Sequence, residues 1–485
     1  MDLSIFRRKL KEDVSMAKPV QLDANGYRKF GMRDKLAYAA GDFGCNMSFA
    51  LKSYLTIFWT QYMGIDEILM ASLLLLVQVW DAINDPVIGA MIDADKRQYK
   101  RNKFLTYIWV GSIGLIIAGA ACFLPFKGAP AMVKNILFVA GYILWDAFYT
   151  VANVPYGSMM SLITTDAGDR AELSTWRSAG AMIAGIGTGS VIPMLIYDSS
   201  SELRGEAIFW LALIMGGLGY IAFQFMIRNT VIRVDTSINL NEDAPKFNIV
   251  KAVGNFLKNR AALGCTLGAF FTMACMYAGQ VATTIVWQAY FKNAQISGLI
   301  SMLSYFGIFL WMPFVRKLVA KFGKKELSVF AGFWALACYA AMCILPITPD
   351  AKGMWMWTAC NVVNALGAGI TSCLAWTLIA DAIDYNEWKF GVRDEGTTYA
   401  LYSFFRKLAQ GVGPSLGLVI AVAMGYDAAL GAAQPIEVAS TMRYLVPSIN
   451  IVSAIGGIFF MGFVFPLNKK TLAAMEADLA ARKAK

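Results

Sequence analysis

Two aspartates lie in the middle of an otherwise apolar segment that runs from about residue 67 to residue 92. Asp81 and Asp85 are four residues apart, so both carboxylates project from one face of a helix. Asn84 lies beside them, and Pro86 cannot donate a backbone hydrogen bond, which leaves one carbonyl oxygen free in the same turn. Carboxylate, amide and carbonyl oxygens are the ligands that a small hard cation prefers. The spacing therefore predicts a site for a cation or a proton.

The composition shows why two charges at this place need an explanation. Of the 485 residues, 57% are apolar and 16% are charged, and apolar runs of about twenty residues recur throughout. This pattern predicts an all-α membrane protein, because lipid offers no partner to unpaired backbone groups. We expect twelve spans, at residues 36–64, 67–92, 104–126, 134–157, 177–197, 207–227, 262–291, 297–319, 327–346, 354–380, 398–424 and 442–466. A charge inside a span costs about 2.5–3.5 kcal/mol on insertion scales, so Asp81 and Asp85 have either a function or basic partners on neighbouring helices.

The formal charge of +10 is concentrated in alternate connections and at both ends of the chain. This distribution argues against nucleic-acid binding, and by the positive-inside rule it places both termini in the cytoplasm, in a multi-pass protein of a bacterial-type inner (plasma) membrane. We expect no signal peptide. The predicted organisation is an N-terminal arm (1–35), a six-helix bundle (36–227), a linker (228–261), a second six-helix bundle (262–466) and a tail (467–485).

Cysteine and histidine usage narrows the chemistry. The eight cysteines lie in apolar segments without metal-type spacing, which predicts packing residues. The chain has no histidine, so any proton relay must use carboxylates or lysine. We expect no catalytic residues, no cofactor and no metal beyond a coupling Na⁺.

Polar residues also recur in the first, fourth and fifth spans. Asp42 and Asn46 are four residues apart. Lys52, further along the same span, either extends to the membrane edge, which we expect, or enters the cavity. Arg177 begins the fifth span, where it either anchors the interface or reaches the centre. The fourth span has a polar stripe at helical spacing, which lines either a site or a structural hydrogen-bond network; its members are Asp146, Tyr149, Thr150 and Asn153.

Charged residues in the second half form two further groups. Asp381, Asp384 and Glu387 stand at three-residue spacing, either as a solvated helix end or as partners of basic residues such as Arg316, Lys317 or Arg393, in ion pairs that hold the cytoplasmic side closed. Arg406 and Lys407 are neighbours in the eleventh span, so they diverge by about 100° and cannot face the same target. Two such cations predict an anionic partner.

Three stretches of the sequence resemble one family of transporters. Trp80 to Pro86, Tyr142 to Tyr156 and Asp381 to Lys407 are similar to the glycoside-pentoside-hexuronide:cation symporters, the major-facilitator branch that includes the melibiose carrier. The resemblance extends from about Lys35 to Pro466. It implies the major facilitator fold, with twelve transmembrane helices in two six-helix halves.

The resemblance also implies roles for individual residues. Asp81 and Asp85 would be cation ligands, joined by Thr150 and with Asn84 and Asn153 nearby. Tyr149, Arg177 and Lys407 would line a sugar pocket together with Asp42, Asn46, Asn153 and Arg406. Trp376 would stack on a pyranose ring or serve in packing. The acids Asp381, Asp384 and Glu387 would form a cytoplasmic gate with Arg393 and Arg316.

The sequence departs from the melibiose carrier at informative positions. Asn46 and Asn153 stand where that carrier has aspartates, Cys45 replaces a lysine, and Arg406 replaces an apolar residue. We therefore expect the electrostatic potential of the pocket to be more positive than in the melibiose carrier, although the charge of Asp42 offsets part of this difference. An anionic sugar such as a glucuronide fits such a pocket.

These features predict a monomeric symporter that imports a glycoside or hexuronide together with Na⁺ or H⁺ by alternating access. The alternatives are a symporter of the same fold for a neutral pentoside, an oligosaccharide or a lysolipid, and more remotely a membrane receptor or an enzyme. The sequence leaves the choice of sugar and ion open.

Overall fold

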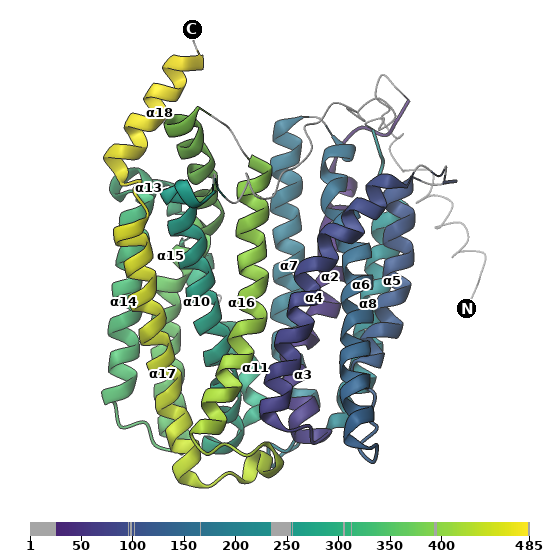
Figure 1. The fold of residues 1–485 in the computed structure, drawn as a ribbon, viewed down its shortest axis with the longest axis vertical. Helices are drawn as coiled ribbons and strands as arrows, with labels where there is room; N and C mark the ends of the chain where they lie inside the picture. The colour runs from purple at the N-terminus through teal and green to yellow at the C-terminus, as the bar shows by residue number, and fades with distance from the viewer. Residues whose placement is uncertain are drawn as a thin grey trace, which may run out of the picture.

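The described part of the chain is a bundle of long helices. In the computed structural model it comprises residues 26–95, 97, 99–100, 102–164, 166–233, 254, 256–303, 306–311, 313–391 and 395–483. Within these residues the secondary structure is helical, apart from isolated bridges such as Tyr197–Leu203. We call the end of the bundle where α2 begins and α18 lies the upper end, and the opposite end the lower end (Figure 1).

The first half of the described chain passes through the bundle six times. The passages are α2 (Met32–Phe49) continued by η1 (Ala50–Tyr54), α3 (Leu55–Ile57) and η2 (Phe58–Tyr62), α4 (Glu67–Ala94), α5 (Lys103–Ala121), α6 (Ala131–Ile163), α7 (Ala167–Ile196) and α8 (Gly205–Asn229). The first passage is thus broken near its middle, and the break η1 contains Lys52.

The second half repeats this up-and-down course. Its elements are α10 (Arg260–Ile285) with η4 (Val286–Tyr290), η5 (Ala294–Ile296), α11 (Ser297–Met302), α12 (Phe306–Trp311), α13 (Val315–Phe322), α14 (Lys324–Ile344), α15 (Ala351–Phe390), α16 (Glu395–Ala423), η7 (Ala428–Ala433), α17 (Ile436–Phe459) with η8 (Phe460–Val464), and α18 (Lys469–Lys483). The described residues of the predicted span 297–319 form α11, α12 and α13, and α15 continues ten residues past its predicted end at residue 380.

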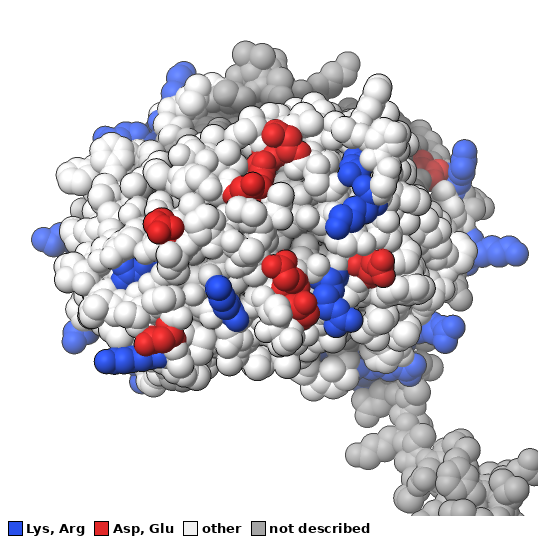
Figure 2. Space-filling model, turned by 90° about the horizontal axis from the view of Figure 1, so that it is seen from below, with Lys and Arg blue, Asp and Glu red and all other residues white. Residues whose placement is uncertain are grey.

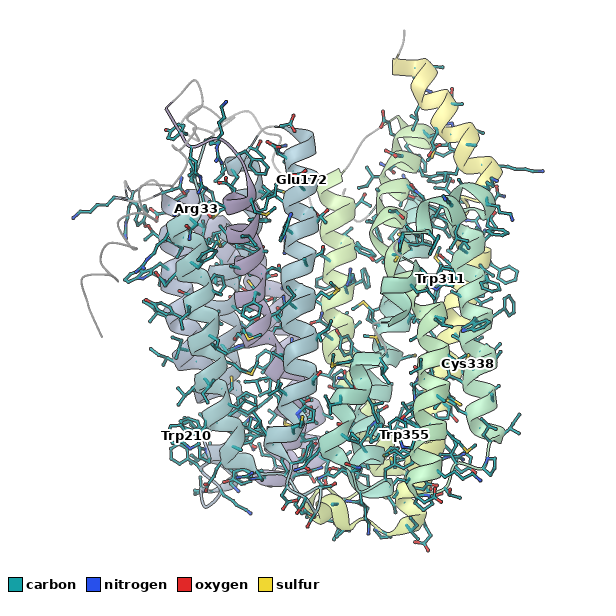
Figure 3. All side chains as sticks on the ribbon, turned by 180° about the vertical axis from the view of Figure 1, so that it is seen from behind. Arg33, Glu172, Trp210, Trp311, Cys338 and Trp355 are labelled. Carbon is teal, nitrogen blue, oxygen red and sulfur yellow. The ribbon has the colours of Figure 1, made fainter. Side chains whose placement is uncertain are left out.

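Nine helices of the described residues are long and apolar enough to cross a membrane. Of the other passages, α2–η2 is broken, α16 carries charged residues, and α11–α12 includes residues outside the described part of the chain. Trp210 and Trp355 lie toward the lower end (Figure 3), and their side chains are exposed. Exposed tryptophans near the end of a bundle are typical of a membrane–water interface.

Several helices begin at a side chain that caps the first turn. Asp66, Asn102, Asp166, Asn259 and Asp350 each accept a hydrogen bond from a backbone N–H of the helix that follows. Asp and Asn are favoured at this position because their side chains satisfy N–H groups that have no partner within the helix. Four of these helices begin within three residues of the predicted starts, but α7 begins ten residues before residue 177, so Arg177 lies inside the helix and not at its start.

The two halves are joined at the lower end. The side-chain amides of Gln61 and Gln288 exchange hydrogen bonds of 2.8 and 2.9 Å, and Gln61 also donates to the hydroxyl of Tyr426 at 2.9 Å. Glu67 accepts a bond from the backbone N–H of Ala428 at 2.7 Å. Seen from below, this face is a continuous surface with scattered charges (Figure 2). Deeper in the bundle, α4 packs against α16 and α7 against α11.

Candidate ion and substrate site

The two aspartates of α4 face a lysine of α16, across the boundary between the halves. Lys407 Nζ lies 3.0 Å from Asp81 Oδ1 and also forms an ion pair with Asp85. Gln78, one turn before Asp81, donates to its other oxygen at 2.7 Å. Asp81 is 4% exposed, whereas the side chain of Asp85 is 30% exposed, so the first carboxylate is buried and the second is partly accessible. The sequence predicts an ion at this place, and in this state a lysine ammonium group lies there.

A second lysine approaches from the break in the first passage. Lys52 Nζ lies 3.5 Å from Asp81 Oδ2, and it lies over the rings of Phe49, Tyr142 and Trp145 at 5.4, 5.4 and 5.8 Å. The expectation that Lys52 extends to the membrane edge is therefore wrong. A carboxylate and three aromatic faces stabilise the ammonium group inside the bundle.

Helix α6 extends this network. Asn84 donates to Asp146 Oδ2 at 2.9 Å and to Thr150 Oγ1 at 3.2 Å, and Thr150 donates to Asp85 Oδ1 at 2.7 Å. Asp146 is 2% exposed. We call the five charged residues Asp81, Asp85, Asp146, Lys52 and Lys407 the carboxylate cluster. The polar stripe of the fourth span thus lies against the two aspartates of the second.

A separate ion pair joins α2 and α7. Arg177 Nε donates to Asp42 Oδ1 at 2.8 Å, and Asn46 donates to the other carboxylate oxygen of Asp42 at 3.0 Å. The guanidinium of Arg177 also lies 5.2 Å from the ring centre of Tyr156. Arg177 therefore reaches across to α2, and its side chain remains 37% exposed.

The remaining predicted site residues of these helices have other contacts. The thiol of Cys45 contacts Asn153 Oδ1 at 3.6 Å, and the described hydrogen bonds do not connect Asn153 to the carboxylate cluster. The ring of Tyr149 stacks on Trp145 at 5.5 Å. The guanidinium of Arg406 lies 5.5 Å from the ring centre of Tyr402, on a different side of α16 from Lys407, as the helical spacing requires.

Two adjoining cavities lie between the halves, and together we call them the central cavity. They share the wall residues Phe49, Ser53, Gln280 and Thr284, and the larger has a volume of about 350 Å³, within the usual range of ligand pockets. Other polar or aromatic wall residues are Asn46, Tyr54, Thr56, Gln78, Tyr142, Thr188, Tyr197, Tyr277, Thr283, Trp287, Ser297, Ser301 and Gln410. Lys52, in the wall of the smaller cavity, is the charged residue of the described wall. Amides, hydroxyls and aromatic rings are the groups that bind sugars.

Comparison with known proteins identifies the chain. The family model described as "MFS/sugar transport protein" matches residues 37–469. The chain belongs to this family. The predicted resemblance to the melibiose-carrier branch of the major facilitator superfamily is confirmed, as is the all-α membrane fold.

Relatives of this sugar-transport family match over nearly the whole chain. An uncharacterized symporter of Bacillus subtilis (strain 168) is 28% identical and covers 93% of this chain and 96% of its own length. The glucuronide carrier protein homolog of Escherichia coli (strain K12) is 24% identical, with 94% and 97% covered. Among solved structures, a D-xylose-proton symporter shares the fold with a TM-score of 0.58 and 14% identity, covering 90% of this chain and 98% of that one.

The structure places one residue of the predicted gate in an ion pair. Lys324 Nζ contacts both carboxylate oxygens of Asp381 at 2.6 and 2.8 Å, and both residues belong to the second half. The start of α14 therefore lies beside α15 and supplies a cation that was not among the predicted partners of Asp381. Asp384 and Glu387 follow on α15, each with further contacts of its own. Arg393 and the side chains of Arg316 and Trp376 lie outside the described residues.

Some candidate site residues were not singled out from the sequence. Asp146 was part of the predicted polar stripe without a role of its own, and Gln78 carried a usable signal, since it precedes Asp81 by three residues in an apolar helix. Gln280 and Trp287 come from the seventh passage, where nothing in their spacing indicates a cavity. Only the packing of α10 and η4 against the first half reveals them.

Proposed function

We propose that the protein is a secondary active symporter that carries a glycoside or hexuronide together with H⁺ or Na⁺. One observation carries the proposal: the central cavity between the halves shares Lys52 with the carboxylate cluster. A sugar in the cavity and an ion in the cluster would act on the same side chain. Their binding free energies are then linked, and the linkage is reciprocal.

The wall of the central cavity supports a sugar as the substrate, with an anionic sugar as the first choice. Its described residues include amides, hydroxyls and aromatic rings, and its charged member is the cation Lys52. A uronate carboxylate would gain a charge-assisted hydrogen bond from this ammonium group. A neutral glycoside is the second candidate, since most of the polar wall is uncharged. The polar wall disfavours a lysolipid.

Transport would proceed by rocking of the two halves about the central cavity. In the present state the lower end is closed by the bonds of Gln61, Gln288 and Tyr426. The side chains of Asp85 and Lys407 are each 30% exposed, and that of Arg177 is 37% exposed, although all three lie on inner helices. This exposure supports access from the upper end. With the basic connections at that end, we place it in the cytoplasm and the protein, as a monomer, in the bacterial inner membrane.

Uptake into proteoliposomes tests this function. The matched probes are radiolabelled methyl β-glucuronide and methyl β-glucoside, which differ in the carboxylate. Each is offered with an inward pH gradient, an inward Na⁺ gradient or no gradient. We expect the glucuronide to accumulate above its external concentration with one of the two gradients and to equilibrate without one. Failure of both sugars to enter under all conditions contradicts sugar symport, and accumulation of the glucoside alone contradicts the anionic preference.

A further inference from the structure

The charges of the carboxylate cluster do not balance. The cluster contains three carboxylates and two ammonium groups, from Asp81, Asp85, Asp146, Lys52 and Lys407. With all of them ionised, one negative charge remains inside the membrane-spanning part of the bundle. An uncompensated charge at this depth is costly, so the cluster favours the uptake of one monovalent cation.

The oxygens of the two α4 aspartates already have donors. For Asp81, Lys407 contacts Oδ1, while Gln78 and Lys52 contact Oδ2. For Asp85, Thr150 donates to Oδ1 and Lys407 contacts Oδ2. A sodium ion would have to displace lysine ammonium groups or hydrogen-bond donors from these oxygens. In this state the pair is a poor metal site.

Asp146 is in a different situation. Its described hydrogen bond comes from the neutral amide of Asn84, which leaves its charge without a directly bonded cation. The charged groups that act on it are Asp81 and Asp85 of α4, Lys52 of η1 and Lys407 of α16. Two titratable residues of its own helix, Tyr142 and Tyr149, lie one turn to either side of it. Helix α7 contributes Arg177, which is paired with Asp42. Helix α5 contributes the titratable residues Lys103 and Tyr107, which lie near the upper end.

We propose that the coupling ion is a proton and that Asp146 binds it. This inference rests on the proposed function and specifies its ion. The step is the addition of a proton from water to the carboxylate of Asp146, which gives a neutral carboxylic acid and breaks no bond. The cluster then has two carboxylates and two ammonium groups, and its net charge is zero.

The central cavity links this proton to the sugar. Tyr142 lines the cavity and is 1% exposed, and its hydroxyl has no partner among the described atoms. Lys52 lines the same cavity and interacts with both Asp81 and Asp146. A neutral cluster is cheaper to enclose than a charged one when the halves close over the sugar. Protonation of Asp146 therefore favours the occluded, loaded state.

Three variants test the assignment. Asp146→Asn mimics the protonated form permanently, and Asp146→Glu keeps a titratable carboxylate. Asp350→Asn is the matched control, because Asp350 caps α15 in a loop and Asn is an equally good cap. Each protein is reconstituted, and uptake and exchange of methyl β-glucuronide and methyl β-glucoside are measured together with external pH. Thermal unfolding in detergent verifies that each variant is folded.

We expect the wild type and Asp350→Asn to accumulate sugar with an inward pH gradient and to make the medium alkaline as sugar enters. Asp146→Asn should lose accumulation and alkalinisation while it exchanges sugar at a rate within about threefold of wild type. Asp146→Glu should retain part of the accumulation and part of the alkalinisation. Accumulation driven by Na⁺ and not by pH overturns the inference and leaves sugar symport standing. Proton-driven accumulation by Asp146→Asn overturns it too. Failure of wild type to move either sugar overturns the proposed function itself.

Discussion

A lysine ammonium group lies between the two aspartates that the sequence marks as an ion site. Lys407 contacts both Asp81 and Asp85, and removal of one partner from such a buried pair typically costs about 3–5 kcal/mol. The sequence predicts the aspartates, because charges in an apolar span stand out. It does not predict that Lys407, 322 residues from Asp85, is their partner, since no spacing rule connects distant helices.

Thr150 is a single-residue test of this network. Its hydroxyl donates to Asp85 and accepts from Asn84, so Thr150→Val removes two hydrogen bonds of the network at nearly constant volume. We expect a loss of about 1–3 kcal/mol in unfolding free energy and weaker gradient-driven uptake. Thr358→Val is the control, because the Thr358 hydroxyl donates to Met354 O of its own helix, away from the cluster. Equal effects of the two substitutions would show that Thr150 has only a structural role.

At the scale of elements, the contact between α4 and α16 sets the geometry of the cluster. Gly411 follows Lys407 by one helical turn and therefore lies on the same face. A Cβ atom added at Gly411 would lie 2.2 Å from Gln78 Cγ, so a side chain at this position would push the helices apart. The close approach of Gly411 brings Lys407 within reach of Asp81.

Gly411→Ala should therefore weaken coupling as well as stability. Overpacking of this kind costs about 1–3 kcal/mol, and we expect a lower unfolding temperature and reduced sugar accumulation. Gly217→Ala of α8 is the matched control, because an added Cβ meets no atom within 4 Å there. Wild-type accumulation by Gly411→Ala, measured in proteoliposomes, would contradict the role assigned to this contact.

The upper end of α4 gives a prediction for acid pH. Hydrogen bonds from the Tyr99 hydroxyl, the Arg97 backbone N–H and the Tyr107 hydroxyl lower the pKa of Asp95 to about 2. Because the folded pKa is below the ordinary value of about 3.9, the stabilisation is present above pH 4 and is lost as the pH falls toward 2. Tyr99→Phe should lower the unfolding temperature at pH 7 and change it little near pH 2. A difference that is independent of pH would contradict this explanation.

The elements were largely predictable because apolar runs of about twenty residues identify spans. The contacts between side chains that are distant in the sequence were not predictable. Because the helix changes to η1 at this point, the Lys52 side chain points into the bundle and not toward the membrane edge. The hydropathy of the sequence does not indicate such a change in the helix. Asp381 lies at its predicted place on α15, but its partner Lys324 comes from the start of α14, a proximity that only packing creates.

For the whole molecule, closure of the lower end defines the state. Gln61 bonds to Gln288 and Tyr426 across the boundary between the halves. Gln61→Ala removes these bonds, and we expect it to shift the equilibrium toward opening of the lower end by about 5- to 150-fold. Spin labels at Met132→Cys and Lys352→Cys, in a background without the native cysteines, would report a longer distance.

Gln224→Ala on α8, near the upper end, is the control for this shift and should leave the distance distribution unchanged. An unchanged distribution in Gln61→Ala would show that the amide bonds do not hold the lower end closed.

The central claim is that the sugar in the central cavity and the proton on the carboxylate cluster bind together. Calorimetric titration of the purified protein with methyl β-glucuronide, in two buffers of different ionisation enthalpy, counts the protons that accompany the sugar. We predict net proton uptake in the wild type at some pH between about 5 and 9, and none in Asp146→Asn. Sugar binding with no proton uptake at any pH in this range would contradict the account.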